Sequence, residues 1–277
     1  MFITVLRKML RNKWMVLCLV IGSVLAVATI SSIPIYSNSI MQRMLQKDLQ
    51  SYQQETNVYP GRYLISQSLT KNGQDYQTGK ENLSHLNEMV NQAYAERLGI
   101  PVQLSVQRYE SVPLQSLVEN HLDDPSYIKK STIAAYRDFW EHITLVSGEL
   151  PSKEKNAGYY EVVISQKAAD RLGLVVGSTA VVAPYGESIQ SDIKVKVTGV
   201  FKYADTSDLY WYQQTSAFNE TMVMDFDLFT SDFVDGGDEQ MLVSTSQWYF
   251  ALDYTQMKVG SAGRYSGIIA AQQKELP

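Results

Sequence analysis

The hydrophobic pattern of the chain begins with one long apolar run. Trp14 to Ile33 reads WMVLCLVIGSVLAVATISSI, twenty residues without a charged side chain. At 1.5 Å per residue, a helix of that length rises about 30 Å, which is the thickness of the hydrocarbon core of a bilayer. Trp14 and Tyr36 flank the run, and amphipathic aromatic rings favour the headgroup region. The pattern predicts a transmembrane helix over residues 14–35.

Two other interpretations of this run stay open. A buried core helix is one, although a basic cluster directly before the run does not favour it. A cleavable signal peptide is the other, because Ala26-Val27-Ala28 resembles a small-residue cleavage site. Against cleavage, the apolar run continues past this point, and Leu17 precedes Cys18 where a lipoprotein signal has Gly or Ala.

Small residues in the run point to helix packing. Gly22 and Ala26 are four residues apart and share one helix face. Such faces let a second transmembrane helix approach closely, although small residues are common in all transmembrane helices. The spacing predicts a packing face at these two positions.

After Pro34 the helical spacing continues over residues 36–56. Apolar side chains recur at intervals of three and four residues: Met41, Leu45, Leu49 and Tyr52. Pro34 either kinks the helix or begins a second one. The pattern predicts a helical stalk whose apolar stripe packs against the domain above it or against another stalk.

The remaining residues, 57–277, alternate between strand-like and helix-like segments. Strands are predicted at 62–69, 102–109, 138–148, 159–165, 178–184, 191–203, 221–229 and 241–252. A hairpin-like turn is predicted at Asn72-Gly73, between residues 62–69 and 74–79, and Val195, Val197, Gly199 and Phe201 are expected to share one face of their strand. Helices are predicted at 83–98, ending before Gly99, and at 166–173, with Ser165 as the N-cap. Loop and short helix are expected over 111–130. Mixed elements in this order predict an α+β domain, with its core at about 140–255.

Charge divides the chain into a basic head and an acidic body. The net charge is −5, yet residues 1–33 contain Arg7, Lys8, Arg11 and Lys13 and no acidic residue, which leaves −9 for the rest. The positive-inside rule therefore predicts a cytoplasmic N-terminus and an extracytoplasmic domain. Residues 1–13 suit a basic amphipathic segment on the membrane surface, or simply a flank that sets topology. An acidic body does not favour nucleic acid as a partner.

The sequence contains little that points to catalysis. One cysteine excludes an intramolecular disulfide and a cysteine-rich metal site, and the three histidines are far apart in the sequence. The motifs GxxxxGK[ST], HExxH and GxSxG do not occur. We therefore expect no catalytic residue, no cofactor and no bound metal. The acidic residues around Gly236-Gly237 read as a solvated loop.

One aromatic group is a candidate contact patch: Tyr210, Trp211 and Tyr212. Aromatic side chains that face outward contact lipids, peptides or partner proteins. Burial of alternate residues along a strand explains the group equally well, and both interpretations stay open.

Four segments resemble one family of membrane proteins. They are LRKMLRNKW (6–14), VSGELP (146–151), EVVISQKAADRLGLVVGSTAVV (161–182) and IKVKVTGVFKY (193–203). Their order, after a basic N-terminus, one transmembrane helix and a stalk, resembles the N-terminal part of FtsX/MacB-type ABC transporter permeases. The resemblance covers about sixty residues closely, and the rest by architecture. It implies a MacB-type periplasmic core domain after the stalk.

The resemblance also implies partners and a role. Such permeases work with a cytoplasmic ABC ATPase and with a second permease chain or half, within the lipid bilayer. It implies export or extraction of a lipid, a lipoprotein or an antimicrobial peptide, with ATP hydrolysed by the separate ATPase. The long region between stalk and core is similar to larger permeases of Gram-positive bacteria.

The sequence departs from the family in one respect. These permeases have further transmembrane helices after the domain, whereas no second apolar run of that length follows here. We therefore expect the chain to be an N-terminal fragment. The alternative is a single-span, membrane-anchored extracytoplasmic sensor or binding module, and a domain released after Ala28 is a third possibility.

Overall fold

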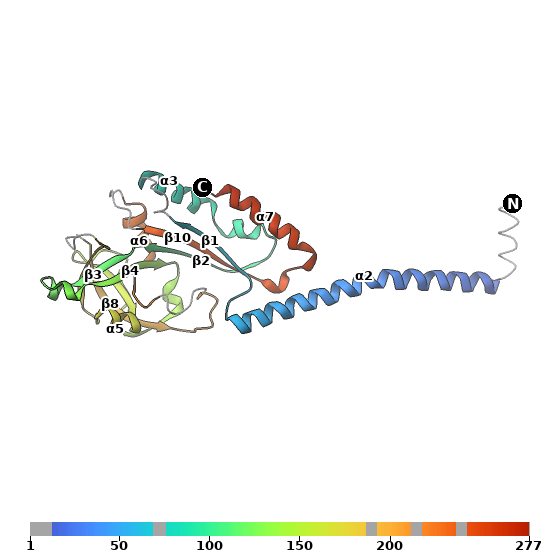
Figure 1. The fold of residues 1–277 in the computed structure, drawn as a ribbon, viewed down its shortest axis with the longest axis horizontal. Coiled ribbons are helices and arrows are strands. Elements are labelled where there is room, and N and C mark those ends of the chain that lie inside the picture. Colours follow the sequence, from blue (N-terminus) through green and yellow to red (C-terminus); the bar gives the residue numbers. More distant parts are fainter. Residues whose placement is uncertain (1–12, 69–75, 187–192, 212–217, 237–242, 277) are drawn as a thin grey trace.

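The computed structural model describes residues 13–68, 76–186, 193–211, 218–236 and 243–276. One long helix, α2 (Lys13–Thr56, 44 residues), projects from a mixed domain (Figure 1). Pro34 lies inside α2 and does not end it. A proline removes one backbone N–H from the ladder, and the rest of a long helix tolerates that loss. The predicted span and stalk are therefore one continuous helix.

The domain contains strands and short helices in alternation. The strands are β1 (Arg62–Ser68), β2 (Val102–Ser111), β3 (Leu114–Val118), β4 (Lys129–Tyr136), β5 (Ile143–Gly148), β6 (Tyr160–Ser165), β7 (Thr179–Pro184), β8 (Lys194–Tyr203), β9 (Thr221–Val223) and β10 (Val243–Leu252). The α-helices after α2 are α3 (Tyr76–Met89), α4 (Gln92–Glu96), α5 (Gln166–Leu172), α6 (Phe226–Phe229) and α7 (Ala262–Glu275). The 3₁₀ turns are η2 (Glu119–His121), η3 (Pro125–Tyr127), η4 (Phe139–His142), η7 (Tyr254–Gln256) and η8 (Val259–Ser261), and η6 (Thr230–Val234) is a π-helix.

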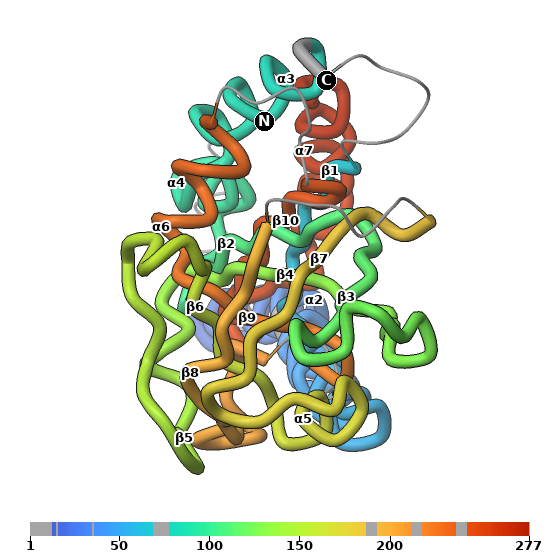
Figure 2. The backbone as a smooth tube through the Cα atoms, turned by 90° about the vertical axis from the view of Figure 1, so that its left-hand side faces the viewer, coloured from blue at the N-terminus to red at the C-terminus, as the bar shows by residue number. Residues whose placement is uncertain are grey.

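All ten strands described in these ranges belong to one sheet. Its order is β1-β10-β2-β4-β3-β7-β8-β6-β9, and β5 pairs with β8. Because β9 also pairs with β4, six of the strands close into a ring, and β2, β10 and β1 extend from it as an arm. Figure 2 shows the helices α3 and α7 above these strands, at the opposite end from α5. The predicted core began at about residue 140, whereas the sheet takes strands from both sides of that residue. The ring and the arm are therefore parts of one sheet.

Apolar residues are buried on both faces of the sheet. The larger cluster joins helices α3 and α4 to the arm and to the inner positions of the ring, and it includes Leu83, Leu86, Tyr94, Phe250 and Val162. The smaller cluster on the other face is rich in aromatic residues and includes Phe139, Phe201, Tyr210, Phe218 and Tyr249. Val162 and Val163 point to different clusters because successive residues of a strand face opposite sides.

The predicted α+β class is confirmed, and so are several elements. The strand at 102–109 is part of β2, and the strands at 159–165, 178–184, 191–203 and 241–252 correspond to β6, β7, β8 and β10. The Ser165 hydroxyl accepts a hydrogen bond from the Ala168 backbone N–H (3.0 Å), so Ser165 caps α5 as predicted. Gly173 ends that helix at φ 68°, a left-handed conformation that glycine adopts easily.

Other predicted elements are wrong. The predicted helix 83–98 is two helices, because the Asn91 side chain caps α4 and so restarts the helix. Only residues 221–223 of the predicted strand 221–229 are extended, and the Asp225 carboxylate then caps α6. The region 111–130 contains β3, which was not predicted. In the segment 138–148, η4 precedes β5.

The prediction that Val195, Val197 and Phe201 share one face of their strand is wrong. Val195 and Val197 lie in the larger cluster, whereas Phe201 lies in the aromatic one. An irregularity in the pairing of β6 with β8, between Val162 and Val163, shifts the alternation. The Asn72-Gly73 turn lies outside the described residues.

Candidate functional site

The N-terminal half of α2 has the properties of a membrane span. Of the described helices, α2 alone is long and apolar enough to cross a bilayer, and its most apolar window has no buried residue. Trp14 is 81% exposed and Tyr36 is 70% exposed, at the two ends of the span. Lys13 begins the helix and is also exposed, whereas Arg7, Lys8 and Arg11 lie outside the described residues.

The hydroxyl groups of the span bond to its own backbone. The Ser23 hydroxyl donates to the Val20 carbonyl (2.8 Å), and the Ser32 hydroxyl donates to the Thr29 carbonyl (2.8 Å). In hydrocarbon, polar groups without a partner destabilise a helix, so these bonds suit the span to lipid.

The predicted packing face lies open. An added Cβ at Gly22 would meet no atom within 4 Å, and Gly22 and Ala26 are both exposed. The described residues therefore place nothing against Gly22, and the packing face stays a prediction about a second helix.

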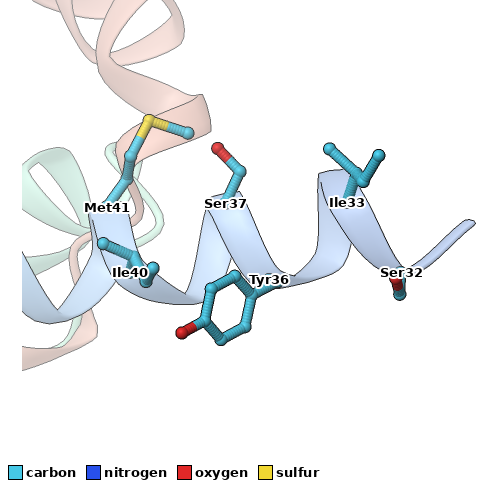
Figure 3. Close-up of a pocket in the computed structure, with 6 residues that line it drawn as sticks. All are labelled: Ser32, Ile33, Tyr36, Ser37, Ile40 and Met41. Atoms are coloured by element: carbon cyan, nitrogen blue, oxygen red, sulfur yellow. The ribbon is translucent and has the colours of Figure 1, made fainter. Parts of the chain in front are cut away.

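A shallow groove lies where the span becomes the stalk. It measures about 350 Å³ and is lined by Ser32, Ile33, Tyr36, Ser37, Ile40 and Met41, all from α2. Figure 3 shows Ile33, Ser37 and Met41 on one side of the helix and Tyr36 on the other. The groove lies on the surface of a single helix. Its lining combines polar and apolar side chains, a mixture that is favourable in the headgroup layer of a bilayer.

The stalk is fastened to the domain by glutamine side chains. The Gln42 amide donates to the Met257 carbonyl (2.6 Å) and accepts from the Val259 N–H (3.2 Å). The Gln46 amide donates to the Thr255 carbonyl (3.1 Å). About two turns further along α2, the Tyr254 hydroxyl donates to the Gln53 side-chain oxygen (3.2 Å). The segment that holds η7 and η8 therefore runs along α2, as Figure 1 shows in orange and red.

The contact face of the stalk differs from the predicted stripe. Leu45 and Leu49 are half-buried, but Met41 is 45% exposed and Tyr52 is 47% exposed. The face toward the domain runs through Gln42, Leu45, Gln46, Leu49 and Gln53. The prediction counted apolar positions only, whereas amide groups make the contact with backbone carbonyls of the turns. The regular spacing of Gln42, Gln46 and Gln53 was the available signal.

The junction between α2 and β1 is tightly built. Asn57 ends the helix in the left-handed region at φ 54°, and its N–H donates to the Gln53 carbonyl (2.9 Å). At Gly61 an added Cβ would lie 2.0 Å from the Leu252 carbonyl oxygen. The Leu252 N–H also donates to the Gly61 carbonyl (2.8 Å). Only glycine allows this close approach of the chain to the end of β10.

Tyr59 closes the same junction. Its hydroxyl donates to the Leu252 carbonyl (2.8 Å), and its ring packs edge-on against Tyr254 with centroids 5.4 Å apart. Burial, together with the nearby charge of Asp253, raises the pKa of Tyr59 to about 12. Both effects favour the neutral phenol, which keeps its hydrogen bond.

Helix α7 follows η8 and is tied back to the arm of the sheet. The Tyr63 hydroxyl donates to the Gln272 side-chain oxygen (2.9 Å), and the Gln272 amide donates to the Tyr94 carbonyl (2.7 Å). Gln272 is buried, and Glu275 pairs with Arg97 (2.7 Å) at the surface. The η7–η8 segment is thus held between α2 on one side and α7 with β10 on the other.

The candidate aromatic patch lies in the smaller cluster. Tyr210 is 2% exposed, so it does not face outward, and Trp211 is half-buried against Tyr203 (centroids 4.7 Å apart). The ring of His142 stacks on Tyr210 (3.8 Å), and its Nδ1 lies 2.6 Å from the Asp208 carboxylate. Burial in the smaller cluster therefore explains Tyr210, although the residue lies in a turn after β8 and not in a strand, while Tyr212 lies outside the described residues.

Among the described residues, no group of three or more His, Cys, Asp and Glu side chains is arranged to hold a metal ion. A second shallow groove, of about 390 Å³, lies beside α5. Its lining includes Leu174, Val175, Val176 and Val200. Ser147 and Gln166 add polar groups to this lining, and none of the lining side chains is titratable, so the chemistry of the groove is that of contact.

Comparison with known proteins agrees with this architecture. A sequence model of the MacB-like periplasmic core domain matches residues 16–254, from the span to η7. The chain belongs to this family. The MacB-like family places it among ABC transporter permeases, which are membrane proteins, and α2 is the candidate span found in the part of the chain that the structure describes.

The other comparisons add less. No curated protein matches the chain. Among solved structures, a domain of a protein assigned as a permease from Porphyromonas gingivalis has 16% sequence identity and a TM-score of 0.35. The match covers 66% of this chain and 75% of that one. A likeness at this level carries no argument, so the family assignment rests on the sequence match.

Proposed function

We propose that this MacB-like chain is the permease subunit that transmits movement between a membrane-bound ATPase complex and an extracytoplasmic domain. The partners are a separate cytoplasmic ABC ATPase and a second permease chain or half. The substrate class is a lipid, a lipoprotein or an antimicrobial peptide. The chain itself has no catalytic role, because the nucleotide is bound and hydrolysed by the partner.

The continuity of α2 carries this proposal. The helix runs without a break from Lys13 to Thr56, so a tilt or shift of the span moves the stalk as one rod. A helix of 44 residues is about 66 Å long at 1.5 Å per residue. The glutamine contacts then pass the movement to the η7–η8 segment, which is joined directly to β10 and α7.

The basic head supports the orientation. Arg7, Lys8, Arg11 and Lys13 precede the span, and the positive-inside rule assigns this end to the cytoplasm. The domain is then extracytoplasmic, on the far side of the membrane from the ATPase, and a mechanical link through α2 is the physical route between them.

The proposal is tested by removing the glutamine contacts. In the complete permease with its ATPase, the combined substitutions Gln42→Ala, Gln46→Ala and Gln53→Ala remove four hydrogen bonds between stalk and domain. Each lost hydrogen bond costs about 0.5–1.5 kcal/mol, so the loss of four weakens the association of the stalk with the domain by well over tenfold. We expect transport to fall about tenfold or more while ATP hydrolysis continues.

The matched control uses glutamines of the same helix that face away. Gln50 and Gln54 are exposed, so Gln50→Ala with Gln54→Ala makes the same kind of change at two positions on the exposed side of the helix. Transport and ATP hydrolysis should both stay at the wild-type level in the control. Full transport by the triple variant would refute the role of the stalk contact.

A further inference from the structure

The end of the domain that contains η8 lies beside the part of α2 where the uncharged stretch ends, and the length of that stretch matches the level of the lipid headgroups. From Trp14 to Gln42 the chain has 29 residues without a charge, which is about 43 Å of helix. This equals the thickness of a bilayer with its headgroup layers, about 40–45 Å. Gln42 bonds to the Met257 carbonyl and the Val259 N–H, so the start of η8 lies at the height where the uncharged stretch ends.

Basic side chains outnumber acidic ones at this level. Asp48 and Asp253 lie here, the latter bonded to the Thr255 that contacts Gln46. They are accompanied by four cations, Arg43, Lys47, Lys258 and Arg264. We name these four residues the basic collar. The rest of the chain after residue 33 is strongly acidic, since the whole of it, collar included, has a net charge of −9. The collar is therefore a local reversal of charge.

Three of the collar side chains are open to a ligand, whereas the guanidinium of Arg264 lies against Gly99, just after α4. All four side chains are exposed, and within the described ranges none of them takes part in an ion pair. Arg43 and Lys47 are four residues apart and share one side of α2. Helical side chains lean toward the helix N-terminus, which for Arg43 and Lys47 is toward the membrane.

We propose that the basic collar binds the anionic headgroups of the bilayer that α2 crosses. The phosphate groups of acidic phospholipids are the ligands, because the collar follows directly on the span and Arg43 is the first charge beyond it. The attraction of a charged surface extends about one Debye length, 8–10 Å, from the headgroups. The contact holds the η8 end of the domain on the membrane surface, and it does not depend on coupling to an ATPase.

The proposal is tested with the full chain reconstituted in vesicles, in the absence of any ATPase. A fluorophore is attached at Gly260→Cys in a Cys18→Ala background, because Gly260 is exposed and an added Cβ there meets no atom within 4 Å. The vesicles contain phosphatidylcholine alone or mixed with phosphatidylglycerol, and a nitroxide on the lipid headgroup quenches the probe. We expect stronger quenching with phosphatidylglycerol, and loss of this difference in high salt.

Charge reversal identifies the residues. Arg43→Glu with Lys258→Glu should abolish the difference between the two vesicle types, since each cation near an anionic surface strengthens association about fivefold. The matched control is Lys129→Glu with Lys130→Glu, the same change at exposed positions at the start of β4. That strand end pairs with β3, on the part of the domain away from the span (Figure 1). The control should keep the wild-type response.

Three results would overturn the proposal: equal quenching in both vesicle types, a full response from the charge-reversed variant, or an equal loss in the control. The neutral pair Arg43→Gln with Lys258→Gln is measured in parallel, with near-ultraviolet circular dichroism of each variant. The glutamine variant removes the two cations without adding negative charge. If it also loses the difference in quenching between the two vesicle types, the loss is due to the missing attraction and not to repulsion by the new carboxylates.

Discussion

The two halves of α2 are one helix in two different environments. Between Trp14 and Ile33 no other part of the described chain covers the helix, and its apolar side chains are exposed. Between Gln42 and Gln53 the same helix is attached to the domain by amide hydrogen bonds and by half-buried leucines. The first half is stabilised by lipid and the second by the domain, so a substitution in one half should leave the other intact.

The largest expected effect follows from a charge within the span. Val24 is exposed near the middle of the apolar run, and Val24→Lys places a cation in the hydrocarbon at a cost of about 3 kcal/mol. We expect a large fall in the fraction of protein that resists an alkaline wash of membranes. The control is Gln50→Lys on the exposed side of the stalk, which should not alter retention. If both variants stayed in the membrane fraction equally after the alkaline wash, the difference in environment between the two halves of α2 would be refuted.

A smaller effect is expected where the stalk meets the sheet. Gly61→Ala forces a methyl group against the Leu252 carbonyl oxygen, 2.0 Å from the ideal Cβ position. Overpacking of this kind destabilises a domain by about 2–3 kcal/mol. Chemical unfolding of the full chain in detergent, followed by near-ultraviolet circular dichroism, measures the loss. Gly22→Ala in the span is the matched control, because its Cβ meets no atom and the domain signal should not change. An unchanged unfolding midpoint for Gly61→Ala would contradict the junction described above.

The smallest effect concerns pH at the junction. Burial, together with the charge of Asp253, raises the pKa of Tyr59 to about 12 from its ordinary value near 10. Because the folded pKa is the higher one, this contribution to stability is complete below pH 10 and is lost as the pH rises toward 12. Solvent screening of this half-buried group limits it to about 1 kcal/mol. Unfolding of wild type and Tyr59→Phe, compared at pH 9 and near pH 12, should show a steeper loss in the wild type. Parallel pH curves would show that Tyr59 does not contribute.

The sequence determined the elements whose signals are local. Twenty uncharged residues after a basic cluster identify a span because hydrocarbon excludes charge, whatever the rest of the chain does. Ser165 and Gly173 delimit α5 because caps act on their own turn of helix. Short apolar runs located β6, β7 and β10, most of whose residues are buried on both faces of the sheet, and alternation located β8.

The tertiary structure alone decided the features that join distant segments. The closure of the ring through β9 and β4, and the split of Val197 and Phe201 between two clusters, depend on pairing and on an irregularity in register. The site shows this most clearly. Of the apolar stripe, Leu45 and Leu49 lie toward the domain, whereas Met41 and Tyr52 are exposed and their packing against another stalk stays a prediction. The spacing of Gln42, Gln46 and Gln53 marks a face of the helix, but the sequence does not show that these glutamines bond to the turns after β10, more than 200 residues away in the chain. Periodicity reports the faces of one helix, so only the folded chain reveals which distant backbone a face contacts.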